Sequence, residues 1–148
     1  MVSPEFQVRY REAVSVLKVV LSGFFDTIGF YQTASETQKK IALNWMEFLE
    51  INELAEQDYT RLSYGQQRLI LIARAMVKSP PLLILDEPCQ GLDRTNRNRV
   101  LELIEHICLD SATQILYVTH ITTDQLNCLR HELRFEVSKD GTFRPNIS

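Results

Sequence analysis

Residues Leu82 to Asp93 read LLILDEPCQGLD. The apolar run over 82–85 is typical of a short parallel strand that is buried on both faces. The run ends at two adjacent carboxylates, Asp86 and Glu87, and a turn containing Pro and Gly follows. Ligands of open α/β sheets bind beyond the carboxyl ends of the strands. The stretch therefore predicts a parallel α/β sheet with two acids at its ligand-binding edge.

Helical patterns lie on both sides of this strand in the sequence. Upstream, Ser63-x-x-Gln66 is a capping box, which predicts a helix of roughly fourteen residues that Ser79-Pro80-Pro81 ends. Downstream, the spacing predicts a helix over 94–109 and a second buried strand over 114–119, QILYVT. The residues expected to face inward are Leu69, Ile72, Ala73, Met76 and Val77 in the first helix, and Val100, Leu103, Ile104 and Ile107 in the second.

The first sixty residues predict helices only. One helix is expected over 12–22, with Val14, Leu17 and Leu21 on one face. A second capping box, Ser35-x-x-Gln38, opens a helix that ends near Glu50. Its inward face is expected to carry Ile41, Trp45, Phe48 and Leu49. The tail, 131–144, reads as two short strands around 139–141.

The acids at the end of the first strand have a chemical and a plain interpretation. Asp86 could hold Mg²⁺, a hard cation that prefers oxygen ligands. Glu87 could polarise a water molecule for attack on a phosphate. His120 follows the second strand directly and would lie at the same edge of the sheet, where it could donate to a phosphate oxygen. The alternatives are two solvated acids and a structural histidine.

The polar residues at the helix starts also allow two interpretations. Ser63 begins a helix whose free N–H groups favour an anion, and Gly65 would let a phosphate approach the backbone. Alternatively, Ser63 is an ordinary N-cap. Asp93, in the Gly91-Leu92-Asp93 turn, is a helix cap if it is considered alone.

The order of these motifs resembles the ABC ATPase family. LSYGQ (62–66), LLILDEP (82–88), GLD (91–93) and VTH (118–120) are similar to its signature, Walker B, D-loop and switch-histidine segments. The resemblance implies an α/β fold, namely part of a P-loop NTPase core with an all-helical signature subdomain and a small β-hairpin at the C-terminus. Residues 1–61 would form the helical subdomain with the preceding Q-loop region. Residues 62–148 would hold the signature helix and the C-terminal part of the catalytic core.

In this family, two ABC domains dock head to tail around two ATP molecules. The resemblance implies that the signature turn contacts the nucleotide held by the opposite domain, and that the Walker B acids act on the domain's own nucleotide. For this chain, the resemblance implies that Ser63, Gly65 and Gln66 contact the nucleotide of the opposite domain, and that Asp93 contacts the opposite domain itself. In the domain's own site, it implies that Asp86 is the Mg²⁺ ligand, Glu87 the general base and His120 the contact to the γ-phosphate.

Three departures from the family pattern stand out. No G-x-x-x-x-G-K-[ST] occurs, so the phosphate-binding Walker A loop is missing from these 148 residues. We therefore expect a C-terminal fragment of a longer ATPase, inactive in isolation and prone to self-association through its open core. Tyr64 replaces the first signature glycine, and Cys89 stands where the family often has Thr or Ser.

Composition narrows the choice of partners. The net charge of -3 gives no electrostatic case for binding nucleic acid, and the three widely spaced cysteines do not suggest a zinc site. No apolar run is long enough to span a bilayer, so the expected location is cytoplasmic, either free or peripheral at the inner face of the plasma membrane. The expected partners are a second ABC domain, in the same or another chain, and a membrane permease.

The chain also looks similar to the second ABC domain of bacterial tandem proteins of the molybdenum-transport or photorepair type, which makes molybdate the expected substrate. This resemblance rests on VVLSGFFDTIGFYQTASETQ (19–38) together with the stretch from Leu62 to Asp93. Two alternatives remain open at this point. One is a non-transport ABC ATPase of translation or DNA maintenance, and the other is a degenerate domain that only binds a partner.

Overall fold

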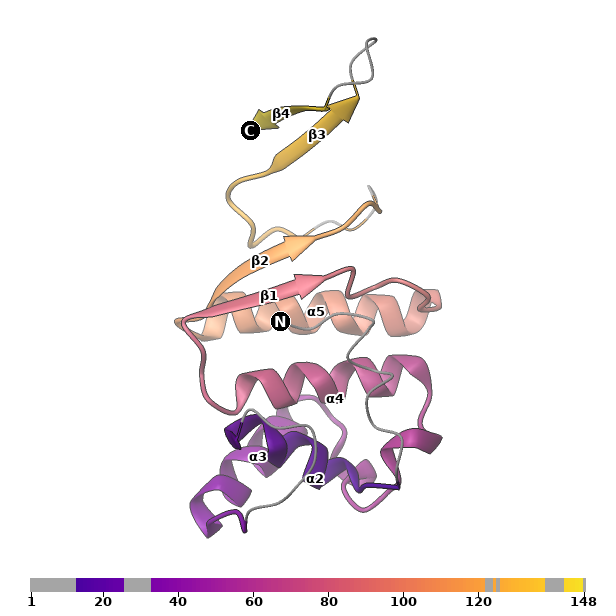
Figure 1. The fold of residues 1–148 in the computed structure, drawn as a ribbon, viewed down its shortest axis with the longest axis vertical. Coiled ribbons are helices and arrows are strands. Elements are labelled where there is room, and N and C mark those ends of the chain that lie inside the picture. The colour runs from indigo at the N-terminus through magenta and orange to yellow at the C-terminus, as the bar shows by residue number, and fades with distance from the viewer. Residues whose placement is uncertain (1–12, 26–32, 122–123, 125, 138–142, 148) are drawn as a thin grey trace.

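A computed structural model describes residues 13–25, 33–121, 124, 126–137 and 143–147. The expectations made for 1–12, for 26–32 and for the turn at 139–141 lie outside the described residues. The elements in chain order are α2 (Val16–Leu21), η1 (Ser22–Phe25), α3 (Glu36–Phe48), η2 (Asn52–Leu54), η3 (Tyr59–Arg61), α4 (Tyr64–Met76), β1 (Leu82–Asp86), α5 (Arg94–Asp110), β2 (Gln114–Val118), β3 (Leu133–Val137) and β4 (Phe143–Ile147). Figure 1 shows a helical lobe at one end, the β3–β4 hairpin at the other, and α4, β1, β2 and α5 between them.

Helix α4 is the centre of the molecule and contacts α2, α3 and α5. The predicted capping box is confirmed, because the Ser63 hydroxyl accepts from the Gln66 N–H at 3.3 Å and the Gln66 Oε1 accepts from the Ser63 N–H at 3.0 Å. The five residues expected to face inward are all buried. Burial extends around the helix to Arg68, Ile70 and Leu71, as expected for a helix packed on several sides.

Helix α5 begins at Asp93, whose carboxylate accepts from the Asn96 N–H at 3.0 Å. Its four predicted core residues are buried, so this expectation is confirmed. The second predicted capping box, at Ser35, also opens α3 as expected. The predicted inward face of α3 is only partly right. Leu49 is buried as predicted, but Ile41 and Trp45 are only partly buried and Phe48 is 45% exposed. The residues of α3 that are buried are Ala42 and Met46, so the helix is rotated relative to the predicted face.

Helix α2 is shorter than predicted and is rotated relative to the predicted face. Val16, Val19 and Val20 are fully buried, whereas Val14 and Leu17 are only partly buried. The start of the helix is held by the segment 55–59, since the N–H groups of Val16 and Leu17 donate to the carbonyls of Gln57 and Ala55. These long-range hydrogen bonds set the rotation of α2, which helical periodicity could not supply.

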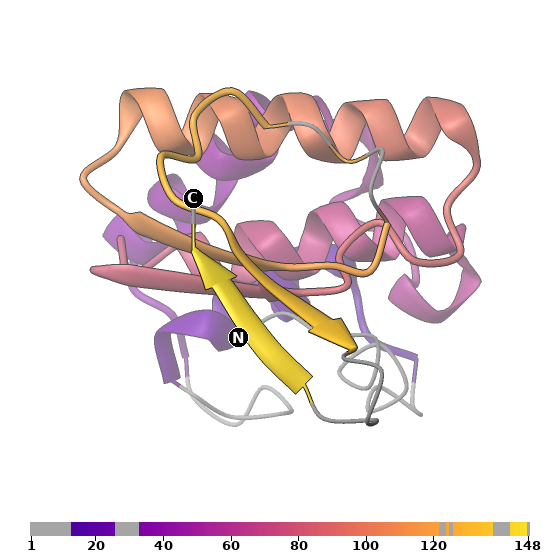
Figure 2. The same ribbon diagram turned by 90° about the horizontal axis from the view of Figure 1, so that it is seen from above.

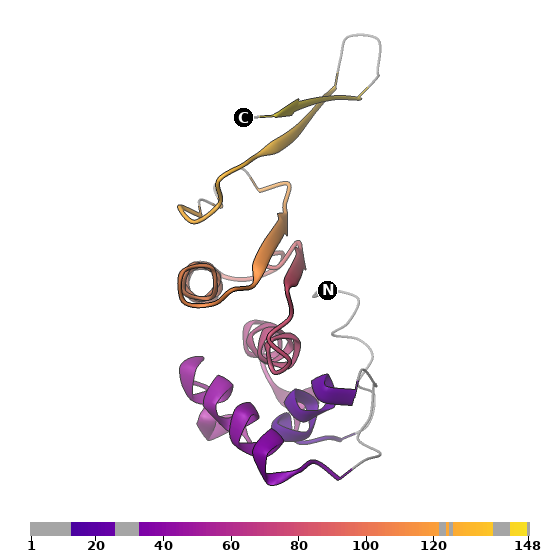
Figure 3. The same ribbon diagram turned by 90° about the vertical axis from the view of Figure 1, so that its left-hand side faces the viewer.

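Strands β1 and β2 form a parallel pair that places Leu82 opposite Gln114 and Asp86 opposite Val118. Both strands were predicted, but the expectation that they are buried on both faces is wrong for the described residues. Leu83 and Leu85 are buried, whereas Leu82, Leu116 and Val118 are 48%, 50% and 44% exposed. Side chains alternate between the faces of a strand. In the described part of the chain, α5 covers one face of the pair and the other stays open (Figure 3).

Strands β3 and β4 pair antiparallel, with Leu133 opposite Ile147, so the two strands predicted in the tail are confirmed. Figure 2 shows this hairpin crossing above β1 and β2, while α5 runs alongside them. None of the helices in the described part of the chain is long and apolar enough to cross a membrane.

Candidate functional site

The predicted site residues lie at one end of the molecule. Strands β1 and β2 end side by side, and helices α4 and α5 begin at that same end (Figure 1). The residues form two groups. Asp86, Glu87 and His120 follow the strands, and the remaining four, Ser63, Gly65, Gln66 and Asp93, lie at the first turns of the two helices.

Glu87 and His120 are in direct contact. The Glu87 Oε1 accepts from the backbone N–H of His120 at 3.1 Å and lies 2.6 Å from the ring Nδ1 of the same residue. The imidazole is 68% exposed and the carboxylate 21% exposed. The second carboxylate oxygen, Oε2, is buried and receives no hydrogen bond from any described residue. The contact therefore holds one oxygen of Glu87 in place, and no described residue engages the other.

The backbone at Glu87 is in an unusual conformation. Its φ of 47° lies in the left-handed region, which costs a residue with a side chain roughly 1–2 kcal/mol. Its N–H donates to the Val118 carbonyl at 2.9 Å, continuing the β1–β2 pairing by one residue beyond the strand. Strain of this kind concentrates at functional sites, where the surrounding structure maintains it. Here the strained residue is one of the predicted catalytic acids.

Asp86 is the last residue of β1 and is partly buried. Among the described residues there is no cluster of three or more His, Cys, Asp or Glu side chains that could hold a metal ion. Mg²⁺ often takes only one or two carboxylates from a protein and completes its octahedron with water and substrate phosphates. The donor set around Asp86 therefore fits a phosphate-bound Mg²⁺ and does not fit an all-protein metal centre.

The turn Ser63–Gln66 begins α4 with its side chains already engaged. Both Ser63 and Gln66 are members of the capping box, so the plain interpretation of Ser63 as an N-cap is structurally correct. Ser63 is nevertheless exposed, and capping by its hydroxyl satisfies only one of the free N–H groups of the first turn. The turn can cap its own helix and still present N–H groups to an anion.

Gly65 is required for packing, which the sequence argument missed. It is buried, and a Cβ at this position would come within 2.6 Å of the Asn96 Cγ. Asn96 is itself held by Asp93, which caps α5. The first turns of α4 and α5 therefore meet at Gly65, and Asp93 fixes the residue that meets it.

A buried acid that the sequence argument did not single out anchors the segment after His120. The Asp124 carboxylate accepts from the Arg97 Nε and the Tyr117 hydroxyl, each at 2.6 Å, and from the Thr119 hydroxyl at 3.2 Å. Its side chain is fully buried, so these contacts offset the desolvation of the charge. Asp124 thus ties α5 and the end of β2 together and fixes the position from which His120 projects.

Tyr117 and Cys89 pack together beneath this edge, with 3.6 Å between the hydroxyl oxygen and the thiol sulfur. Burial, and then the hydrogen bond to Asp124, raises the pKa of Tyr117 far above its ordinary value. Burial also raises the pKa of the Cys89 thiol. Both groups are therefore neutral at physiological pH and have a packing role in this structure.

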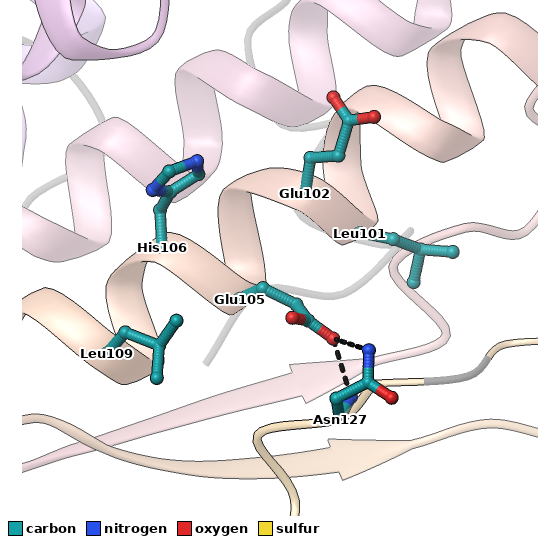
Figure 4. A pocket seen from close by; sticks show the side chains of 6 residues that line it. All are labelled: Leu101, Glu102, Glu105, His106, Leu109 and Asn127. Atoms are coloured by element: carbon teal, nitrogen blue, oxygen red, sulfur yellow. Dashed lines mark hydrogen bonds between the residues drawn. The ribbon is translucent and has the colours of Figure 1, made fainter.

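The pocket drawn in Figure 4 lies on the outer side of α5, away from these residues. It is lined by Leu101, Glu102, Glu105, His106, Leu109 and Asn127. The Glu105 Oε1 accepts from the backbone and side-chain nitrogens of Asn127 at 2.5 and 3.2 Å. This contact is a second attachment of the segment after β2 to α5, and the pocket contains none of the predicted site residues.

The fold and these motifs are those of an ATP-binding cassette. The sequence profile described as "ABC transporter" matches residues 3–90, more than half of the chain, and the chain belongs to this family.

Three curated relatives are similar in sequence to this chain. The ABC transporter ATP-binding protein ModF of Escherichia coli (strain K12) is 43% identical over 97% of this chain and 29% of its own length. The uncharacterized ABC transporter ATP-binding protein YlmA of Bacillus subtilis (strain 168) is 40% identical over 81% of this chain and 46% of its own length. The molybdate import ATP-binding protein MolC of Haemophilus influenzae is 34% identical over 73% of this chain and 43% of its own length. The chain spans less than half the length of each.

Solved structures show the same fold. A putative metal-chelate type ABC transporter in an inward-facing conformation matches with a TM-score of 0.68 and 25% identity, covering 93% of this chain and 68% of that chain. An ATP-binding cassette of an ABC transporter in its ADP conformation matches with a TM-score of 0.70 and 21% identity, covering 88% and 53%. Together with the described elements, these matches confirm an α/β cassette fold.

Proposed function

We propose that this chain supplies the signature and Walker B half of a cassette that hydrolyses ATP in the service of transport. The observation that carries the proposal is the Glu87–His120 pair, 2.6 Å apart at the carboxyl ends of two parallel strands. The second carboxylate oxygen of Glu87 makes no hydrogen bond to a described residue, and a carboxylate at this edge is suited to accept a proton from water as the water attacks a phosphate. The relatives named above are ATP-binding proteins of transporters, which supports transport over the alternatives of a translation or DNA-maintenance ATPase or a partner-binding domain.

In the domain's own site, Glu87 acts as general base and His120 contacts the γ-phosphate. In the imidazolium form both ring nitrogens are donors, so that Nδ1–H can donate to Glu87 while Nε2–H of the exposed ring donates to a phosphate oxygen. Asp86, next to Glu87 and in register with the end of β2, would hold Mg²⁺. That ion, when bound, supplies charge neutralisation on the phosphates.

In the opposite site, the turn at the start of α4 meets the nucleotide of a second cassette. Ser63, Gly65 and Gln66 offer a helix N-terminus whose free N–H groups and dipole favour an anion. Asp93 lies in the neighbouring loop, where it would join the opposite cassette. One matching structure is that of a dimeric cassette, which supports pairing with a second cassette as a working arrangement for this chain.

The division of labour within the chain follows from these roles. Residues 1–61 would belong to the helical subdomain with its Q-loop region, and 62–148 to the signature helix and the C-terminal part of the catalytic core. The Walker A loop, absent from the 148 residues, has to come from elsewhere. We refer below to a protein that contains this chain together with a Walker A loop as the complete ATPase.

A permease partner and an imported oxyanion complete the proposal. MolC is named for molybdate import, and a matching structure, cbiO1 from Clostridium perfringens, is part of the ABC transporter complex cbiONQ. We infer by relationship that the complete ATPase works with a membrane permease from the cytoplasmic side, with molybdate as the cargo. The chain itself contains no cargo site in this scheme, because the permease would carry the substrate.

The proposal is tested by ATP turnover in the complete ATPase. Magnesium-dependent hydrolysis is expected, and it should require Glu87, His120 and a second cassette. Absence of hydrolysis in the unsubstituted complete ATPase would contradict the proposal. Substrate is tested separately, by asking whether molybdate uptake by cells depends on the protein while uptake of phosphonate or thiamine does not.

A further inference from the structure

Arg68 is a buried cation that receives no hydrogen-bonding partner from the described part of the chain. The residue is 0% exposed, and none of the residues that the structure describes accepts a hydrogen bond from its Nε, Nη1 or Nη2. Burial lowers the pKa of this guanidinium, although arginine stays charged in proteins. An unpaired buried charge destabilises a fold. Arginine at this position therefore opposes stability, which suggests that it is needed for something else.

The position of Arg68 in α4 sends its side chain back to the start of the helix. Side chains on a helix lean toward the N-terminus, so a long side chain covers the residue four positions earlier. The Arg68 Cζ accordingly lies 5.9 Å from the ring centroid of Tyr64, the first residue of α4. A desolvated guanidinium at this distance from an aromatic face is attracted by the ring. Arg68 thus holds the residue between Ser63 and Gly65.

The other groups that act on the charge of Arg68 lie in two places, Tyr59 before α4 and two residues near the end of β1. Asp86 and Cys89 are among the groups that favour its charged form and limit the fall of its pKa. The ring of Tyr64 also reaches the loop that follows β1, because its Cε1 lies 3.9 Å from where a Cβ of Gly91 would be. The ring of Tyr64 therefore lies between the guanidinium of Arg68 and the loop that follows β1.

We propose that Arg68 is a positioning residue, which ties the Ser63–Gln66 turn through the ring of Tyr64 to the loop at Gly91, the loop that follows Asp86 and Glu87. The inference rests on the proposed function, in which the turn acts on one ATP and the acids act on the other. Within one cassette, Arg68 is then the side chain that links the two ATP sites of a head-to-tail pair. Occupancy of one site adjusts the geometry of the other through this contact.

The first test removes the charge in the complete ATPase. Arg68→Met keeps an unbranched side chain of similar length, and Arg99→Met makes the same change at an exposed arginine of α5 as a control. We expect Arg68→Met to lower kcat about ten-fold, a typical size for coupling between sites, with KM for ATP changed by less than about three-fold. The unfolding temperature should stay equal or rise, because an unpaired buried charge is removed. Arg99→Met should behave as the unsubstituted protein.

If Arg68 only supported the fold, the effects of its substitution on kcat and on the unfolding temperature would differ from those expected above. The inference is overturned if Arg68→Met leaves kcat unchanged, or if kcat and the unfolding temperature fall together. If the unsubstituted complete ATPase hydrolyses no ATP, the proposed function fails. If it hydrolyses ATP and only the Arg68 result is negative, the inference alone fails.

The second test uses the exposed partner, where substitution does not disturb the core. Tyr64→Phe keeps the aromatic face that meets the guanidinium, and Tyr64→Leu removes it, so kcat should fall further in the leucine variant. The double variant Arg68→Met with Tyr64→Leu should be no slower than the slower of the two single variants, because both remove the same contact. Equal effects of Phe and Leu, or fully multiplicative effects in the double variant, would overturn the inference.

Discussion

The Nδ1 atom of His120 lies 2.6 Å from the Oε1 atom of Glu87, although the two residues are 33 positions apart in the chain. The parallel register of β1 and β2 brings them together, since it pairs Asp86 with Val118 and leaves both residues just beyond the strand ends. The contact orients the imidazole and fixes one carboxylate oxygen at the same time. It therefore supports a shared role for the two residues in one hydrolytic site.

In the complete ATPase, Glu87→Gln should abolish turnover while ATP binding is retained. The amide has nearly the same shape but cannot accept a proton from water, and loss of a general base typically lowers the rate about 10²- to 10⁴-fold. Turnover is measured by phosphate release and binding by a fluorescent nucleotide. Near-normal phosphate release by this variant would show that another group is the base.

The isolated chain should bind Mg²⁺-ATP weakly or not at all. The phosphates of ATP are normally cradled by a loop of backbone N–H groups and a lysine, and the 148 residues contain no such motif. Titration calorimetry of the isolated chain measures the affinity directly, with the complete ATPase as the positive control. A micromolar Kd for the isolated chain would refute this expectation.

The isolated chain should self-associate through the open face of the β1–β2 pair. Leu82, Leu116 and Val118 are all more than 40% exposed on that face, and contiguous apolar surface of this kind promotes association. Leu116→Lys should weaken association in a sedimentation concentration series. Leu109→Lys, at a residue of α5 that is 72% exposed, is the matched control and should not. A monodisperse monomer at high concentration would count against the prediction.

Ser63→Arg should damage the ATP site of the opposite cassette and spare ATP affinity in its own. A bulky cation at the start of α4 would block the approach of the partner's phosphates. The competing explanation is loss of the N-cap, worth about 1 kcal/mol of stability. A mixing experiment separates the two explanations. The Ser63→Arg cassette is paired with a partner cassette, and only the partner's Walker A loop, which faces the substituted turn, is left intact. Normal turnover with only a lower unfolding temperature would leave Ser63 as a cap.

Gly65→Ala should destabilise the fold by about 1–3 kcal/mol, the usual range for overpacking. The new Cβ would come within 2.6 Å of the Asn96 Cγ, in a contact between two helix starts. Adding Asn96→Ala should recover part of this loss, as measured by denaturant unfolding. Gly91→Ala is the control, because its added Cβ would lie 3.9 Å from the nearest atom and its cost comes from a φ of 75°. Adding Asn96→Ala to Gly91→Ala should therefore recover no stability. Equal relief at both positions would mean that Asn96 is not the obstacle.

Local features of the chain were predictable because the interactions that set them span only a few residues. The capping boxes at Ser35 and Ser63 join residues three positions apart, so the sequence shows both partners at once. The core faces of α4 and α5 follow helical periodicity for the same reason. The motif order also placed Asp86, Glu87 and His120 at one sheet edge, since parallel strands end on the same side.

Contacts between distant segments were not predictable in this way. Asp124 as an anchor, Asn96 against Gly65, and the unpaired burial of Arg68 each depend on how α4, α5 and β2 pack together. No residue pattern distinguishes a buried arginine from an exposed one on a helix that packs on several sides. The rotation of α2 likewise follows from backbone hydrogen bonds to residues 55–57, roughly forty positions away.

The identity of the cassette and the starts of α3, α4 and α5 therefore follow from the sequence, through caps, periodicity and motif order. The working geometry follows from packing. The register of β1 against β2 brings Glu87 within reach of His120, and the covering of a single face leaves Leu116 exposed. Tertiary structure governs these features because hydrogen bonding and burial between distant segments depend on the whole arrangement of elements, whereas capping and helical periodicity are properties of a few consecutive residues.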